Sequence, residues 1–590
     1  MDQFGDGRWE RHRPRVVRML ASRWWRGGLA VTAGALPALA FPAPSLWWFA
    51  YVALVPWMLL ARSAPTARRA ALDGWLGGLG FMVAVHHWLL PSLHVFTVVI
   101  AALLGLLWAP WGWLVRRFLG GVPTSGRAAA ALVVLPSGWL MVELVRSWEG
   151  LGGPWGLLGS SQWQVTPALR LASVGGVWLI SAFVVALNTG VALLVVAAAA
   201  RRSASGASAP GAPASYASAS YAPAPGSSSS VSPGVPVVPA LAGLLAVVTA
   251  TCAAWAWAPR PESAGHVRIA VVQPGIIEDG IASADKRLAR EEALTRTLVG
   301  RDPDLVVWGE SSVGYDLADR PDVARRITAL SREVGADILV NVDARRSDRP
   351  GIFKSSVLVG PDGPTGDRYD KMRLVPFGEY IPARSLLGWA TSVGKAAGED
   401  RRRGDRQVVM NTGGDTGSGT GTGTDTDTGS GGQHLRFGPL VCFESAFPDM
   451  SRRLTRDGAQ LLLAQSATSS FQSSWAPGQH ASLAALRAAE TGRPMVHATL
   501  TGVSAVHAPD GSRVGSPLGT SASAAAVYDV PLGKGETAYV KWGDWPVHAA
   551  LLVLAALAAA EGLRAVRRPA PERHGPRART VHESPVRPGR

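Results

Sequence analysis

Two short stretches carry the most information in this sequence: YDKMRLVPFGEYIP at Tyr369–Pro382, and LVCFE at Leu440–Glu444. Together they supply a lysine, several acids and Cys442, which is one of only two cysteines in 590 residues. A cysteine becomes a strong nucleophile when a nearby ammonium group or a helix N-terminus favours its thiolate form. The two stretches therefore predict a nucleophile site.

Both stretches lie in a region, from His266 to about Val540, where short β-branched runs alternate with amphipathic segments. This alternation is typical of an α/β domain, in which polar side chains at strand ends form the site. The expected strands are Val267–Gln273, Leu305–Trp308, Ile338–Val342, Ser355–Val359, Pro439–Cys442, Leu461–Gln465 and Met495–Thr499, and the expected helices are Asp285–Val299, Val323–Val334, Pro448–Arg456 and Gln479–Glu490.

The rest of the chain has a different composition, rich in long apolar runs. Hydrophobic residues make up 47% of the sequence and charged residues only 17%, which indicates a membrane protein. A helix needs about 20 apolar residues to cross a bilayer. About eight runs approach that length, near 27–43, 45–61, 72–92, 95–115, 127–145, 172–199, 237–258 and 546–564. A signal peptide is the alternative for the first run, but a second run follows at once, which favours a retained span.

The arginines are concentrated at the two chain ends and in alternate loops. The net charge of +15 could indicate nucleic acid binding, but this placement fits the positive-inside rule better. The rule predicts a basic cytoplasmic segment at 1–26, a basic cytoplasmic tail at 565–590, and an α/β domain outside the cytoplasm. Seven spans are expected within 27–258 and the last at 546–564.

Two segments of low complexity interrupt this pattern. Residues 203–236 are rich in Ala, Ser, Pro and Gly, and residues 412–432 are mostly Gly and Thr. Such compositions cannot bury enough apolar surface to fold. We expect a disordered cytoplasmic linker and a flexible insertion in the 266–540 domain, respectively.

Three residues are candidates for the chemistry. Alone, Glu310 after its strand and Lys371 in its polar turn would be surface charges, and Cys442 would fill a core. Together they can supply a nucleophile, a carboxylate that moves protons, and a cation that stabilises an oxyanion. Such a site needs no metal and no cofactor. With Cys252 inside an apolar run, a disulfide framework is not expected.

The order WGE (308–310), YDKMRLVPFGE (369–379) and VCFE (441–444) resembles the Glu-Lys-Cys triad of the nitrilase superfamily. With the flanking spans, nearly the whole chain is similar to the apolipoprotein N-acyltransferase family. The resemblance implies an αββα sandwich, with Glu310 as general base, Lys371 at the oxyanion and Cys442 as the acylated nucleophile. It also implies supporting roles for Glu379, Phe443 and Glu444.

In the membrane part, Glu143 and Arg146 resemble a Glu-x-x-Arg pattern of the family, and Trp155 lies in the outer loop that follows. Charges inside a span are costly unless they are paired, so a structural pair and a contact with a lipid headgroup are both open.

Some positions depart from the family pattern. Gly309 stands where proline is common, QSATSSF (465–471) stands where Asn-Asp and an aromatic residue are common, and HATLT (497–501) lacks the usual Arg and Asn. Nearby, His480, Arg487, Glu490, Arg493 and Pro494 fit the pattern. These differences bear on substrate preference and rate.

The resemblance implies a multi-pass enzyme of the bacterial cell membrane. Its acyl donor would be a phospholipid and its acceptor the α-amine of a diacylglyceryl apolipoprotein, with a thioester between the two steps. We expect a monomer with no nucleic acid partner. A membrane-tethered amidase or nitrilase, and a catalytically weakened lipid-binding paralogue, are the alternatives.

Overall fold

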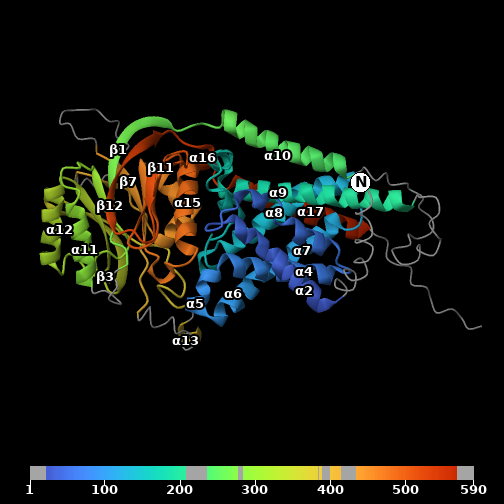
Figure 1. The fold of residues 1–590 in the computed structure, drawn as a ribbon, viewed down its shortest axis with the longest axis horizontal. Coiled ribbons are helices and arrows are strands. Elements are labelled where there is room, and N and C mark those ends of the chain that lie inside the picture. Colours follow the sequence, from blue (N-terminus) through green and yellow to red (C-terminus); the bar gives the residue numbers. More distant parts are fainter. Residues whose placement is uncertain are drawn as a thin grey trace, which may run out of the picture.

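A computed structural model describes residues 22–207, 236–276, 284–382, 384–387, 399–413 and 434–567 of the chain. A helical part, formed by the first half of the chain and its last helix, lies beside a sandwich of two β-sheets (Figure 1). Helices α14 (Pro448–Arg456) and α15 (Ala476–Thr491) belong to the sandwich, and their apolar residues share one buried cluster with the helical part. The two parts therefore have a continuous core.

The sandwich consists of two six-stranded sheets. The first has the order β12-β1-β2-β3-β4-β5 and the second β11-β10-β9-β8-β7-β6. In each sheet the three adjacent strands β1, β2, β3 or β7, β8, β9 are parallel, and the outer pairs are antiparallel. The strands are β1 (Glu262–Gln273), β2 (Leu305–Trp308), β3 (Asp337–Arg345), β4 (Ile352–Gly360), β5 (Gly363–Asp370), β6 (Met410–Asn411), β7 (Arg436–Val441), β8 (Leu461–Ser466), β9 (Met495–Thr499), β10 (Ser504–His507), β11 (Arg513–Leu518) and β12 (Ala524–Lys534).

Alternating side chains build the layers. In β2, Leu305 and Val307 face the second sheet, while Val306 and Trp308 pack under α11 (Ala284–Arg296) and α12 (Pro321–Val334). Because every strand residue of β2 is buried, both faces of this sheet are covered, as a parallel sheet requires. The order of layers is helices, sheet, sheet, helices, which is the expected αββα sandwich.

The helical part contains five helices that are long and apolar enough to cross a membrane, among the residues that the structure describes. They are Val95–Leu119 (α6 and α7), Ser125–Arg146 (α8), Thr166–Ser203 (in α9, Thr166–Ala207), Val237–Trp257 (α10) and Trp545–Arg567 (α17). A sixth is possible if Ala67–Val85 (α4) and His87–Leu93, bent by 64°, form one span. The expected span near 27–43 falls on α2 (Arg23–Ala35), and that near 45–61 on the shorter apolar helix Trp47–Arg62. The count of about eight therefore stays a prediction.

The two predicted low-complexity segments lie largely outside the described residues. Residues 203–207 belong to helix α9, so the helix continues into the start of the predicted linker at 203–236. Of the predicted insertion at 412–432, only Thr412 and Gly413 are described, in a turn after β6. The linker and the insertion stay predictions.

Helix α9 is broken near its start. Gly175 and Gly176 have non-helical backbone angles, and Gly176 has a φ of +66°, which favours glycine. A new helical segment begins at Val177. Its first backbone N–H groups need partners outside the helix, and one of them is supplied by the sandwich.

Candidate active site

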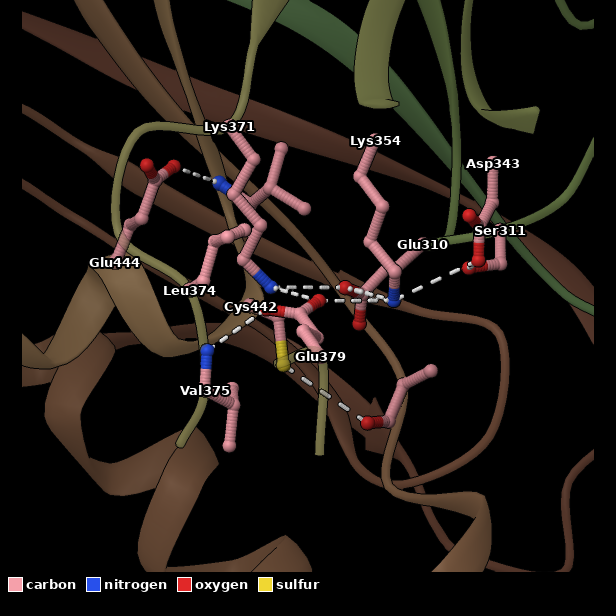
Figure 2. Close-up of polar contacts among 12 residues, drawn as sticks. Glu310, Ser311, Asp343, Lys354, Lys371, Leu374, Val375, Glu379, Cys442 and Glu444 are labelled. Atoms are coloured by element: carbon pink, nitrogen blue, oxygen red, sulfur yellow. Dashed lines mark hydrogen bonds and ion pairs between the residues drawn. The ribbon is translucent and has the colours of Figure 1, made fainter. Parts of the chain in front are cut away.

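Four charged side chains form an alternating square at the ends of the sandwich strands. Glu310 follows β2, as the sequence predicts, and Lys371 follows β5, a strand that the sequence did not predict. Glu379 comes from the loop after Lys371, and the fourth group is Lys354 on β4. Glu310 Oε1 accepts hydrogen bonds from Lys371 Nζ at 3.1 Å and Lys354 Nζ at 2.8 Å. Glu379 Oε1 lies 2.8 Å from Lys371 Nζ and 3.1 Å from Lys354 Nζ (Figure 2).

These charged groups are buried and shift one another's pKa values. Burial opposes ionisation of Glu310, but the charges of Lys354 and Lys371 outweigh it and lower the pKa of Glu310 to about 2. Burial likewise opposes the charged form of Lys371, yet Glu310 and Glu379 raise its pKa above the ordinary lysine value. The site therefore holds a stable carboxylate beside a stable ammonium group.

The nucleophile sits in a constrained turn. Cys442 is the first residue after β7 and has a φ of +52°, a left-handed conformation that is uncommon for a residue other than glycine. Its sulfur lies beside the charged square and faces the Ala467 carbonyl at 3.9 Å (Figure 2). Burial and the charge of Glu310 raise the pKa of Cys442 to about 12, against the lowering effect of Lys371. The resting sulfur is thus a thiol that needs a base.

Glu444 joins the two stretches that carry Lys371 and Cys442. One of its oxygens accepts hydrogen bonds from the Tyr369 hydroxyl and the Met372 and Arg373 backbone N–H groups. The other accepts from the Val441 backbone N–H at 2.7 Å. The Glu444 carboxylate is fully buried. It therefore holds the Lys371 loop against the Cys442 turn, which is a structural role beside the candidate catalytic groups.

Helix α15 holds both ends of the nucleophile turn, the 3₁₀ turn Cys442–Ala446. His480 Nε2 lies 3.1 Å from the Cys442 carbonyl oxygen, and Arg487 donates to the Ala446 carbonyl at 2.8 Å. Arg487 is also paired with Glu490, whose Oε1 accepts from the Val177 backbone N–H at 2.8 Å. The broken membrane helix α9 is thus connected to the nucleophile turn through two buried side chains.

The membrane-side candidates, Glu143 and Arg146, both bind the backbone of the loop that follows α8. Glu143 accepts from the Leu158 backbone N–H at 2.7 Å, and Arg146 donates to the carbonyls of Trp155 and Gly156. Each charge therefore anchors the loop backbone. The pattern supports the structural alternative, with the loop itself as the partner.

This loop reaches the sandwich through Trp155. Its indole N–H donates to Gln479 Oε1 at 2.8 Å, next to His480. Phe443, beside the nucleophile, packs edge-on against Phe447 and lies over Gly153 of the same loop. Phe443 therefore contacts the membrane part directly.

The departures from the family pattern have structural explanations. A Cβ on Gly309 would lie 1.9 Å from the Leu500 backbone nitrogen, so this close approach of the two sheets requires glycine. Gln465 donates to the Trp308 and Leu339 carbonyls and accepts from Ser356, which links the sheets. His497 packs against His480 with ring centroids 4.6 Å apart.

Lys354 is the residue of the charged square that sequence reasoning missed. It directly precedes the predicted strand Ser355–Val359. In the structure it lies opposite Asp343 in the β3–β4 register, with Nζ 3.9 Å from the carboxylate. The sequence feature that could have pointed to Lys354 is its position next to a predicted strand whose other side chains are mostly buried. No group of three or more His, Cys, Asp or Glu side chains in the described ranges could hold a metal ion.

Comparison with known proteins gives two family matches that divide the chain. Residues 33–190 match the apolipoprotein N-acyltransferase N-terminal domain, and residues 268–538 match the carbon-nitrogen hydrolase family. The apolipoprotein N-acyltransferase of Geobacter metallireducens is 30% identical over 90% of this chain and 94% of its own. That of Azotobacter vinelandii is 29% identical over 91% and 95%, respectively. The crystal structure of an amidase from Nesterenkonia sp. covers 49% of this chain and 97% of its own, at 18% identity and a TM-score of 0.32.

Proposed function

Because this chain belongs to the apolipoprotein N-acyltransferase family, we propose that it moves an acyl chain from a membrane phospholipid to the α-amine of a diacylglyceryl-cysteine on an apolipoprotein. The observation that carries the proposal is the cluster of buried Glu310 and Lys371 with half-buried Cys442, beside a membrane-spanning part. The positive-inside pattern supports a catalytic part outside the cytoplasm, with both chain ends inside.

In the first step, the Cys442 sulfur attacks the ester carbonyl of the phospholipid. Glu310 takes the thiol proton, and the carbonyl oxygen gains negative charge as the C–S bond forms. The Lys371 ammonium group stabilises that oxyanion. The ester C–O bond then breaks, Glu310 returns the proton to the leaving oxygen, and a lysophospholipid departs from the thioester.

In the second step, the amine of the acceptor attacks the thioester carbonyl. Glu310 takes a proton from the amine, the C–S bond breaks, and that proton returns to the Cys442 sulfur. An amide is formed and the thiol is regenerated. The pKa of the resting thiol is raised, so a positioned base is needed to remove its proton in the first step. The same residue returns a proton to the sulfur in the second step.

Lys371 has two tasks in this scheme. At rest its Nζ neutralises both carboxylates of the square. When it turns to the oxyanion, Glu310 loses one of its two hydrogen-bond donors, and its basicity rises as the thiol must give up its proton. Glu379, which also accepts from the Val375 backbone N–H at 2.8 Å, keeps the lysine within reach.

The test is to incubate the purified full-length protein with a phospholipid that carries a labelled acyl chain. We expect label on Cys442 by mass spectrometry, and its transfer to a diacylglyceryl lipopeptide. Cys442→Ala should abolish both signals. Cys252→Ala is a matched control because that cysteine is exposed in α10, and it should retain both.

The same experiment separates the alternative functions. A hydrolase would release free labelled fatty acid without a lipopeptide product, and a lipid-binding paralogue would give no covalent label. Survival of N-acylation in Cys442→Ala would refute the assignment of the nucleophile.

A further inference from the structure

A separate apolar groove lies where the membrane helices meet the end of the sandwich. Its volume is about 570 Å³, within the range of ordinary ligand pockets of ~300–1,000 Å³. One wall is formed by α9 with Leu179 and Phe183, the other by α10 with Ala250 and Ala253. Helix α16 (Ala538–Trp542) closes one end. None of the residues that line the groove belongs to the charged square or to the nucleophile turn.

The mouth of the groove lies at the level expected for the membrane surface. Trp257 ends α10 and is 81% exposed, Trp542 ends α16 and is 67% exposed, and Trp545 begins α17. Tryptophans gather at membrane–water interfaces, where their rings are half apolar and half polar. From Trp257 back to Ala250 the wall runs along α10 for about 10 Å, given the rise of an α-helix. The groove therefore points from the interface into the apolar layer.

Two charged residues line the groove, Lys541 and Glu536, and both are exposed. Lys541 lies at the rim and is exposed, and it forms no ion pair with any residue that the structure describes. The walls below it are almost wholly apolar. A cation and a carboxylate above an apolar slot are complementary to a zwitterionic headgroup on an acyl chain, with the phosphate at Lys541 and the ammonium group at Glu536.

Helix α10 also needs a partner other than protein. Only 6% of the residues in its most apolar stretch are buried, whereas 67% are buried in the corresponding stretch of α9. Most of α10 is therefore covered by lipid, and the groove is the place where a lipid would be enclosed by α9, α10 and α16 together. A lipid held there would fasten α10 to the sandwich.

We propose that this groove binds one membrane glycerophospholipid as a resident, non-reacting ligand, with an acyl chain between α9 and α10 and its phosphate at Lys541. The lipid is distinct from the acyl donor, because the groove contains no catalytic group. Its binding does not depend on the proposed transferase chemistry.

The test is native mass spectrometry of the full-length chain in detergent, titrated with deuterated phosphatidylethanolamine. A Cys442→Ala background prevents any covalent acyl-enzyme. Ala253→Trp fills the groove, and Lys541→Glu reverses the charge at its mouth. Ala256→Trp is the matched control, because Ala256 is exposed on the same helix and does not line the groove.

We expect Ala253→Trp to bind one phospholipid fewer than the parent and the Ala256→Trp control. Lys541→Glu should weaken that binding by about tenfold, the effect of losing one charge-assisted contact to a phosphate. Thermal unfolding of each variant checks that it is folded, and Lys541→Glu is an exposed change that leaves packing intact. Equal lipid counts in all the proteins, or the same loss in Ala256→Trp, would overturn the proposal.

Discussion

Replacing Lys354 by methionine should change the acid limit of catalysis while leaving the nucleophile in place. Methionine keeps much of the aliphatic length and removes the charge. Lys354 Nζ lies 2.8 Å from Glu310 Oε1, which at an effective dielectric constant of ~20 corresponds to an attraction of about 6 kcal/mol as an upper bound. Lys371 remains to stabilise Glu310, and one opposite charge at such a distance usually shifts a carboxyl pKa by about 1–3 units.

Loss of the Lys354 charge should raise the pKa of Glu310 and so lower the rate at acid pH. In the wild type the pKa of Glu310 is lowered to about 2, so the base is ionised throughout the accessible pH range. Losing Lys354 raises this pKa to about 3–5, so Glu310 becomes protonated below about pH 5 and the rate falls there. The lowered pKa also stabilises the fold above the ordinary glutamate pKa of about 4.3, and this contribution is lost as pH falls through about 2.

The assay is the initial rate of acylation of the enzyme by a fluorescent phospholipid between pH 3 and pH 9. We expect a flat acid limb for the wild type and for Lys354→Arg, which keeps the charge. For Lys354→Met the rate should fall below about pH 5. Lys534→Met, which removes an exposed lysine paired with Glu262, is a second control. An unchanged acid limb in folded Lys354→Met would refute the reasoning.

Three further substitutions test the surroundings of the site. Gly309→Ala should lower the free energy of unfolding by about 1–3 kcal/mol or more, since its Cβ would collide with backbone, whereas Gly519→Ala, in open space, should change little in thermal denaturation. Gln465→Leu should cost about 2–4 kcal/mol in the same measurement, because it leaves buried carbonyls without donors. Burial raises the pKa of Glu490 to about 7, so stability should fall from about pH 4.5 to pH 7, the range in which the unfolded chain has released this proton and the folded protein still holds it. Glu490→Gln should remove that fall in the free energy of unfolding, which is about 2–4 kcal/mol by the size of the pKa shift. The exposed substitution Glu536→Gln should leave it in place. An unaltered pH profile of unfolding in Glu490→Gln would contradict this prediction.

The sequence predicted the parallel core of the sandwich because buried parallel strands are short β-branched runs with distinct ends. Strand β9 and helix α14 coincide with their predicted bounds, Met495–Thr499 and Pro448–Arg456. The strand predicted at Pro439–Cys442 ends at Val441, since the positive φ of Cys442 takes the chain out of the sheet. Strands such as β11 were missed because their residues are mostly exposed and carry little apolar alternation.

The predicted triad is brought together, while its environment could not be predicted. Lys354 gains its role from the β3–β4 register and from a carboxylate 44 positions earlier in the chain, and neither is visible in local sequence. The number of membrane spans could not be predicted from local sequence either. Apolar runs give the length of a hydrophobic segment but do not show where it breaks into short helices, as happens after Ala35.

The shared carboxylate of Glu444 has a consequence for how activity is gained and lost. Its two oxygens hold backbone N–H groups from both sides of the site, at Met372 and Arg373 on one side and Val441 on the other. Opening either side leaves a buried charge short of donors, so the two sides should open together. In native-state hydrogen exchange these three amides should exchange as one unit. Partial unfolding would then yield molecules that hold both Lys371 and Cys442 in place or neither, with no population that keeps the lysine but has lost the thiol.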